Sequence, residues 1–150
     1  MNAVISHAEK MDIDAMCELL RALFEIESDF TFNAEKHRNG LELMLEEKQT
    51  CCIFVAEIDQ LVIGMCSIQV LFSTAEGGQV GLIEDLIVHE RYRRHGIGRQ
   101  LLLAIENWAQ NQGLSRIQLL ADKGNKAALD FYLQQAWHNT DLVALRKSLL

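Results

Sequence analysis

Residues 89–102 read HERYRRHGIGRQLL and gather four of the chain's eight arginines, with two glycines separated by one residue. Arginine donates charge-assisted hydrogen bonds to phosphate oxygens, and glycine removes the Cβ atom that would hold a phosphate away from the backbone. The segment joins an apolar stretch to an amphipathic one. It is therefore expected to lead into the first turn of a helix, where free N–H groups and the helix dipole favour an anion. The pattern predicts a pyrophosphate site.

The spacing of the two glycines excludes the commonest nucleotide loops. A dinucleotide loop of the form G-x-G-x-x-G needs a third glycine at position 101, where this chain has Leu101. The form G-x-x-x-x-G-K-[ST] does not occur in the chain. Because two glycines also fit a tight turn with solvated arginines, the spacing alone leaves both interpretations open.

The elements that must position this segment follow from hydrophobic periodicity and turn residues. They predict the order β-α-α-β-β-β-α-β-α-β in one α/β domain over residues 1–150, with a mixed sheet and helices on both faces. Strands are expected at residues 3–8, 51–58, 61–72, 80–90, 115–121 and 142–149. Helices are expected at 13–24 after an N-cap at Asp12, at 33–47, from the glycine segment to Gln112 with Gly113 ending it, and at 125–135.

The charge of the chain is unevenly distributed. The net charge is −7, and residues 1–76 carry fourteen acids and five bases, whereas residues 77–150 carry seven acids and nine bases. Either these charges lie on solvated helix faces, or the acidic half meets a cation and the basic half an anion. An acidic chain without a basic tail argues against nucleic acid as a partner.

Neither a membrane span nor a secretory signal is evident in the sequence. No apolar run approaches the roughly 20 residues that cross a bilayer, and the first residues lack a basic and an apolar signal region. A cytoplasmic location without a membrane partner is expected. The four cysteines, at positions 17, 51, 52 and 66, fit no C-x-x-C spacing and are expected to be free, buried or half-buried thiols. Because no histidines pair with metal-ligand spacing, no metal site is predicted.

Two motifs resemble those of a known family. Arg93-x-x-Gly96-x-Gly98, after an apolar strand and before an amphipathic helix, resembles the [QR]-x-x-G-x-[GA] signature of the GNAT family of N-acetyltransferases. Residues 84–102 resemble the family's strand-loop-helix motif along their whole length, and residues 125–137 resemble its N-x-x-A-x-x-F-Y segment. The pair Ala136-Trp137 departs from the Gly-Phe that is common there, which puts only the local turn in question.

The resemblance implies the GNAT fold, with a mixed sheet of six to seven strands, and acetyl-CoA as the co-substrate. Backbone amides of residues 94–99 would hold the pyrophosphate. Main-chain groups of Leu86 and Val88 would hydrogen-bond the pantetheine between strands 80–90 and 115–121. Asn125 either caps its helix or contacts the pantetheine. The predicted coenzyme-binding residues are Leu86, Ile87, Val88, Arg93, Arg94, His95, Gly96, Ile97, Gly98, Arg99 and Asn125.

Acetyl transfer to an amine needs a base, because a free alkyl amine titrates near 10.4. The resemblance assigns Tyr132 as the proton donor to the departing sulfur. Glu84 is predicted as the base, directly or through a water molecule, because an acid inside so apolar a strand is costly unless it is paired or functional. Its neighbour Asp85 is expected on the opposite strand face, as an alternative base or as a structural partner.

The acceptor is expected to be a small, cationic amine. In this fold the acceptor passes a wall built by the first two helices and the link between them. In this chain the link is acidic and aromatic, which suits a cation. The same composition fits a solvated loop equally well. The residues predicted to bind it are Glu27, Asp29, Phe30, Phe32 and Asp85. A peptide or protein N-acetyltransferase and a non-catalytic acyl-CoA sensor are the alternatives. Dimers are frequent in the family, and the apolar strand expected at 142–149 offers an edge for pairing.

Overall fold

Five strands form one mixed sheet in the computed structural model, which describes residues 2–27 and 29–150. The chain divides into two compact units, residues 1–119 and 120–150, and the whole sheet belongs to the first. The strand order is β1-β2-β3-β4-β5, antiparallel from β1 to β4 and parallel between β4 and β5. The strands are β1 Val4–His7, β2 Cys51–Ile58, β3 Leu61–Ser73, β4 Gly78–Val88 and β5 Ile117–Leu119.

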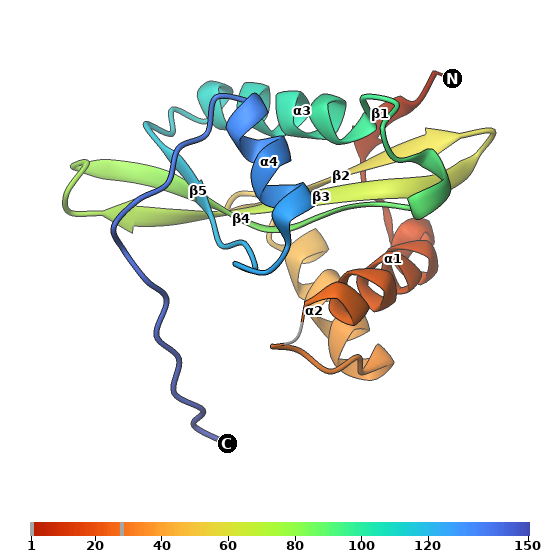
Figure 1. Cartoon of the computed structure of the whole chain (residues 1–150), viewed down its shortest axis with the longest axis horizontal. Helices are drawn as coiled ribbons and strands as arrows, with labels where there is room; N and C mark the ends of the chain where they lie inside the picture. The colour runs from red at the N-terminus through yellow and green to blue at the C-terminus, as the bar shows by residue number, and fades with distance from the viewer. Residues whose placement is uncertain (1, 28) are drawn as a thin grey trace. The chain divides into compact units, whose positions relative to one another are not determined.

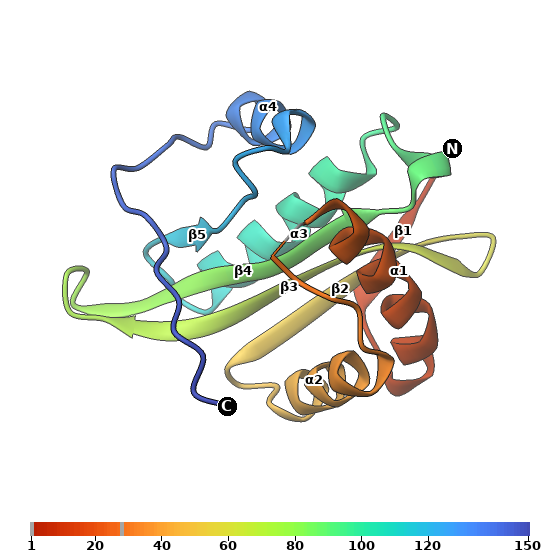
Figure 2. The ribbon, with the colours of Figure 1, turned by 60° about the horizontal axis from the view of Figure 1, so that its bottom comes forward.

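The α/β class and the mixed sheet predicted from the sequence are confirmed. Helices α1 and α2 cover one face of the sheet and α3 covers the other, as Figure 1 and Figure 2 show. The helices are α1 Ile13–Ile26, α2 Ala34–Glu46, α3 Ile97–Asn111 and, in the second unit, α4 Lys126–Gln134, with short 3-10 turns at Lys10–Asp12 and Glu90–Tyr92. Within the described residues, none of these helices is long and apolar enough to cross a membrane.

The predicted strand at residues 142–149 is wrong, and the sheet has five strands rather than six or seven among the described residues. Its apolar residues are exposed, with Leu142, Val143 and Leu145 at 77%, 81% and 92% of their full accessible surface. A strand needs a neighbour that takes its backbone hydrogen bonds. The second unit, residues 120–150, holds helix α4 and no strand with which residues 142–149 could pair.

Two buried layers hold the first unit together. Beneath α1 and α2, a cluster joins Met16, Leu20 and Leu41 to Ile53, Val55, Met65 and Ile87 of the sheet. Beneath α3, the buried side chains are Ile97, Leu101, Leu102, Ile105 and Ala109. A Cβ atom added at Gly64 would lie 3.2 Å from the Leu101 side chain, so this glycine lets α3 pack closely on the sheet.

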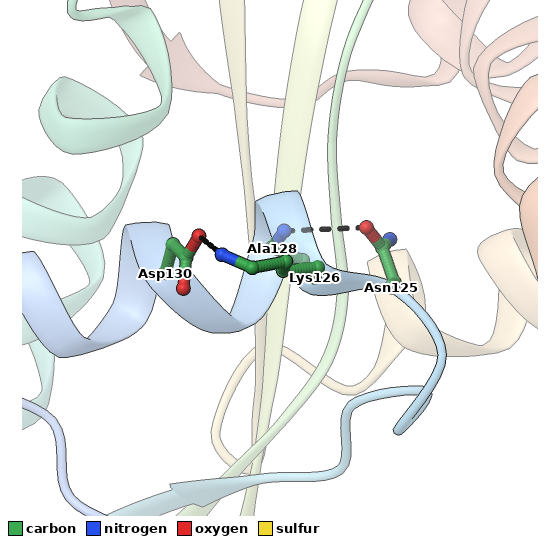
Figure 3. Close-up of polar contacts among 4 residues, drawn as sticks. All are labelled: Asn125, Lys126, Ala128 and Asp130. Carbon is green, nitrogen blue, oxygen red and sulfur yellow. Dashed lines mark hydrogen bonds and ion pairs between the residues drawn. The ribbon is translucent and has the colours of Figure 1, made fainter.

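Helix ends follow the predicted capping residues in most places. Gly113 has φ 77°, the left-handed conformation expected of the residue that ends α3. Asn125 accepts a hydrogen bond from the Ala128 amide at 3.2 Å, and Lys126 pairs with Asp130 at 2.5 Å one turn further on (Figure 3). Asp12 precedes α1 as predicted, but its carboxylate accepts from the Glu9 amide behind it instead of capping the helix.

The turn after α4 is strained where the sequence departs from the family pattern. Ala136 has φ 67°, a left-handed conformation that costs a residue with a Cβ atom about 1–2 kcal/mol and costs glycine almost nothing. The following Trp137 donates its amide to the Tyr132 carbonyl at 3.1 Å, and the two rings lie 5.8 Å apart. The indole therefore holds the turn against α4.

Candidate active site

Strand β4 has an open edge over its second half. It pairs with β5 only over Gly81–Ile83, although it continues to Val88. The amide of His89 donates to Ile63 on β3. Because main-chain groups along a strand alternate between its two edges, those of Leu86 and Val88 point away from β3, whereas those of Ile87 point toward it. Leu86 thus presents its amide and carbonyl to an added extended ligand, and Val88 presents its amide, because the Val88 carbonyl accepts a hydrogen bond from Arg93 Nε.

A β-bulge interrupts β4 at the start of this open edge. Ser67 of β3 pairs with Asp85 and Ile68 pairs with Ile83, so Glu84 has no partner of its own. Two residues that oppose one in a bulge do not keep the strict alternation of strand faces. The expectation that Glu84 and Asp85 lie on opposite faces is therefore wrong, because both line the same cavity between the sheet and α2.

The two acids have different surroundings. Glu84 is exposed, whereas Asp85 is partly buried and its Oδ2 accepts a hydrogen bond of 2.9 Å from the hydroxyl of Ser67, which is fully buried. Burial raises the pKa of the Asp85 carboxyl from 3.8 to about 6; the Ser67 hydrogen bond works against this rise and the Glu84 charge adds to it. A carboxyl with such a pKa exchanges protons close to neutral pH.

The segment between β4 and α3 forms a loop rich in unsatisfied amides. Arg94 and Gly96 have φ 64° and 79°, in the left-handed region, and α3 begins at Ile97. Among the described residues, none accepts a hydrogen bond from the backbone amides of residues 94–99. Amides turned outward by left-handed residues, at a helix N-terminus, make a concave anion site. A Cβ atom at Gly96 would meet no protein atom within 4 Å, so the surface beside it is open.

The polar side chains of the loop divide into tethered and exposed ones. Arg93 donates from Nε to the Val88 carbonyl at 2.8 Å, which ties the loop to the end of β4. A ring nitrogen of His95 lies 3.3 Å from the Tyr92 carbonyl. Arg94 and Arg99 are exposed, and the buried Ile97 anchors the first turn of α3. The loop therefore combines a tethered backbone with exposed positive charge, which suits a phosphate group.

A cavity of about 540 Å³ lies under α1 and α2, against the sheet face that carries the bulge. Its carboxylates are Glu47, Glu84 and Asp85, and Lys36 is the cation on its wall. Burial, with a smaller contribution from the charge of Lys36, lowers the pKa of His37, whose Nε2 accepts from the Asn33 amide. The lining residues are Leu20, Phe24, Lys36, His37, Gly40, Leu41, Leu43, Met44, Glu47, Thr50, Cys51, Gln69, Glu84 and Asp85.

Of the residues predicted to bind the acceptor, Asp85 lines this cavity and the link residues do not. The Phe30 ring lies 5.3 Å from that of Phe24 and is tilted by 49° to it. The Phe32 ring lies 5.1 Å from that of His37, so both support rings that do line the cavity. The Arg21 guanidinium stands 4.0 Å over the Phe32 ring, which therefore already holds a cation of this chain. Glu27 and Asp29 belong to the link itself, outside the lining.

Several residues of the site were not singled out from the sequence. Ser67, Gln69 and Glu47 come from a strand interior and a helix end, and only the fold brings them to Asp85 and the cavity. Ser67 did carry a signal, because it is a polar residue inside the apolar run of β3.

The prediction of free thiols is confirmed. Cys17, Cys52 and Cys66 are buried and unpaired with another cysteine, and Cys51 is half-buried on the cavity wall. Burial raises the pKa of Cys52 to about 12, which keeps that thiol protonated. In the described part of the chain, no three His, Cys, Asp or Glu side chains gather as a metal site would require.

Tyr132 and Asn125 belong to the second unit. Tyr132 lies half-buried on α4, between the rings of Phe131 and Trp137. Asn125 uses its Oδ1 to cap α4 (Figure 3), so the capping interpretation of this residue is confirmed. Its side-chain NH2 group is a separate donor, and a role toward the pantetheine stays a prediction.

Comparisons with known proteins identify relatives of this chain. The chain is 28% identical over 101 residues, 67% of its length, to the uncharacterized N-acetyltransferase YobR of Bacillus subtilis. It is 38% identical over 52 residues, 35% of its length, to the L-ornithine N5-acetyltransferase NATA1 of Arabidopsis thaliana. The chain spans only 38% and 23% of the lengths of these two curated relatives.

A solved structure matches the fold of the chain, and a known family matches its sequence. The solved aminoglycoside N-acetyltransferase AAC(6')-Iy, in complex with CoA, superposes with a TM-score of 0.85 at 18% identity and covers 99% of this chain and 96% of that one. The family described as acetyltransferase (GNAT) family matches residues 13–137, which confirms the resemblance inferred from the glycine loop and the α4 segment. The chain therefore belongs to the acetyltransferase (GNAT) family.

Proposed function

We propose that the protein moves the acetyl group of acetyl-CoA to a primary amine of a small, cationic metabolite. The observation that carries this proposal is that strand β4 contributes to both the acidic cavity and the anion-binding loop. Its bulge brings Glu84 and Asp85 to an acidic cavity, and its open edge runs from there into the loop of unsatisfied amides. One strand thus joins a carboxylate pair for an amine to a backbone site for a phosphate.

The residues present fit acetyl-CoA. The amides of residues 94–99 would hold the pyrophosphate, with Arg94 and Arg99 adding charge, and the backbone of Leu86 and Val88 would hold the pantetheine. When bound, acetyl-CoA supplies an activated acetyl group as a thioester. The solved relative that contains CoA supports the choice of this co-substrate.

Transfer of the acetyl group requires proton movement at two places. The acceptor must lose a proton to become a nucleophile, and the acids at the bulge, Glu84 or Asp85, lie on the cavity wall where such a proton can be taken up. The departing sulfur must gain a proton, a role that the resemblance of residues 125–137 assigns to the phenol of Tyr132. A phenol hydroxyl can donate a hydrogen bond or a proton to a thiolate.

The charge of the cavity supports a cationic acceptor. Glu47, Glu84 and Asp85 outweigh Lys36 on its wall, and a volume of about 540 Å³ is in the range of small-molecule sites. The named acceptors of two relatives, an aminoglycoside and ornithine, both carry amino groups, which supports the same class. An anionic amine fits this wall poorly.

Thiol release from acetyl-CoA in the presence of different amines tests the proposal. We expect turnover with diamines and amino sugars, and little with an aminophosphonate or a short peptide. Glu47→Gln should raise the KM of a diamine about threefold to fivefold, because a partly exposed charge pair contributes up to ~1 kcal/mol. Glu46→Gln, one residue earlier and outside the cavity lining, is the matched control. Preferred turnover of peptides, or acetyl-CoA binding without turnover of any amine, would contradict the proposed acceptor.

A further inference from the structure

Ser67 is a fully buried polar residue at the centre of the sheet, with 0% of its surface exposed. It lies on β3 between Ile53 of β2 and Asp85 of β4 in the strand register. Its hydroxyl donates to Asp85 Oδ2 at 2.9 Å. A buried hydroxyl is expensive unless it is bonded, so this hydrogen bond fixes both the serine and the carboxylate.

Asp85 is held in place while one of its oxygens stays available. Among the residues that the structure describes, no donor is bonded to Asp85 Oδ1, and the residue lines the cavity. Glu84 beside it is exposed, and within the same described residues its carboxylate has no hydrogen-bond or ion-pair partner. A group that transfers a proton must keep one geometry, which favours the hydrogen-bonded carboxylate of Asp85 over the exposed one of Glu84.

Other titratable and charged groups face Asp85 from each element around it. Glu84 on β4 and Cys66 on β3 interact electrostatically with it, and the cavity wall adds residues of α2 and β2. The groups on that wall are Lys36, His37, Glu47 and Cys51. The Cys66 thiol is fully buried and its pKa is raised by that burial, so it stays neutral. Among these groups, the charge of Glu84 is the one that shifts the proton affinity of Asp85.

We propose that Asp85 is the general base that takes the proton from the acceptor amine, and that Ser67 is the positioning residue that holds its carboxylate. This inference rests on the proposed function. The N–H bond of the acceptor ammonium breaks and an O–H bond forms on Asp85, which leaves a neutral amine with a free electron pair. That pair forms the new C–N bond while the C–S bond of the thioester breaks. The nitrogen then releases its second proton to solvent, and the sulfur that leaves takes up a proton from an acid. Glu84 contributes negative charge at the cavity instead of accepting the proton.

The pH dependence of kcat/KM for a diamine separates these roles. Wild type should lose activity toward acid with a midpoint near the pKa of Asp85, about 6. Asp85→Asn should abolish this acidic limb and lower kcat by about 10²–10³-fold. Ser67→Ala should move the limb to higher pH, because the charged carboxylate loses a donor. Glu84→Gln should move the limb to lower pH, because a neighbouring negative charge is removed. Ser73→Ala, also on β3 but outside the cavity lining, should leave it unchanged.

A carbon-13 NMR titration of the Asp85 carboxyl in the coenzyme-free protein gives a readout without turnover. Its midpoint should rise in Ser67→Ala and fall in Glu84→Gln, and equal midpoints in wild type and Ser67→Ala would overturn the role of Ser67.

In the kinetic experiment, an acidic limb that survives in Asp85→Asn and disappears in Glu84→Gln would assign the base to Glu84. If wild type neither binds acetyl-CoA nor turns over any amine, the proposed function fails and the base role fails with it. Turnover with an intact limb in Asp85→Asn overturns the base role alone.

Discussion

Two adjacent carboxylates of this protein acquire different properties from one irregularity in a strand. The bulge at Glu84 sets both side chains toward the cavity, but Ser67 bonds only Asp85. Their environments separate the two acids chemically, which is the usual way in which paired carboxylates divide acid-base and electrostatic roles. The sequence identified this pair because acids are rare inside an apolar strand. It could not reveal the bulge or the Ser67 partner, since both depend on the register between β3 and β4.

A buried carboxyl with a raised pKa lowers stability as the pH rises. The native state binds the Asp85 proton more tightly than the unfolded state, so the cost of ionisation develops between pH 4 and 6 and is complete by pH 8. Asp85→Asn should therefore raise the free energy of unfolding, by roughly 1 kcal/mol more at pH 8 than at pH 5. Urea unfolding at the two pH values measures this. A gain that is equal at both would show that Asp85 ionises with an ordinary pKa.

Tyr132 is the residue to which the family resemblance assigns the proton donor. Tyr132→Phe keeps the ring that packs against Trp137 and removes only the hydroxyl. We expect kcat to fall tenfold or more, in line with the usual contribution of an acid-base group. Steady-state kinetics with a diamine acceptor measures the effect, and an unchanged kcat would remove the acid role from Tyr132.

Among the elements, the glycine loop before α3 depends most on backbone conformation. The sequence predicted its place between a strand and a helix, because glycine spacing and periodicity are local properties. It did not predict that Arg93 tethers the loop to Val88, since that contact needs the strand end and the loop in three dimensions. The strand expected at 142–149 failed for a related reason: a β-forming pattern makes a strand only where a neighbour pairs with it.

Two glycines that flank α3 allow a matched test of the loop. Gly96 precedes the helix and Gly113 follows it, both have positive φ, and a Cβ atom at either would meet no protein atom within 4 Å. Alanine at either position should cost about 1 kcal/mol of stability through backbone strain. Only Gly96→Ala should also weaken acetyl-CoA binding, by tenfold or more, because its methyl group would enter the surface of free amides. Equal affinities in Gly96→Ala and Gly113→Ala would contradict a backbone anion site at the loop.

At the scale of the whole chain, the uneven charge of the sequence corresponds only in part to the sites. Four of the six arginines of the basic half do gather at the loop, but the acids on the cavity wall come from both halves: Glu47 from the first, Glu84 and Asp85 from the second. The other acids of residues 1–76 lie outside the cavity lining, and six of them are exposed on α1 and α2, such as Glu18 and Glu42. Composition could therefore indicate the sign of the ligands, whereas only the fold selects which charges meet them.

Titration calorimetry of the wild-type protein with acetyl-CoA, with ATP and NAD as controls, tests the central claim most directly. The loop of residues 94–99 and the open edge of β4 together require both a pyrophosphate and an extended arm. We therefore expect micromolar binding of acetyl-CoA and much weaker binding of ATP and NAD. Acetyl-CoA binding no tighter than that of the two controls, in protein shown to be folded, would mean that the loop is only a turn and would contradict the assignment of this site.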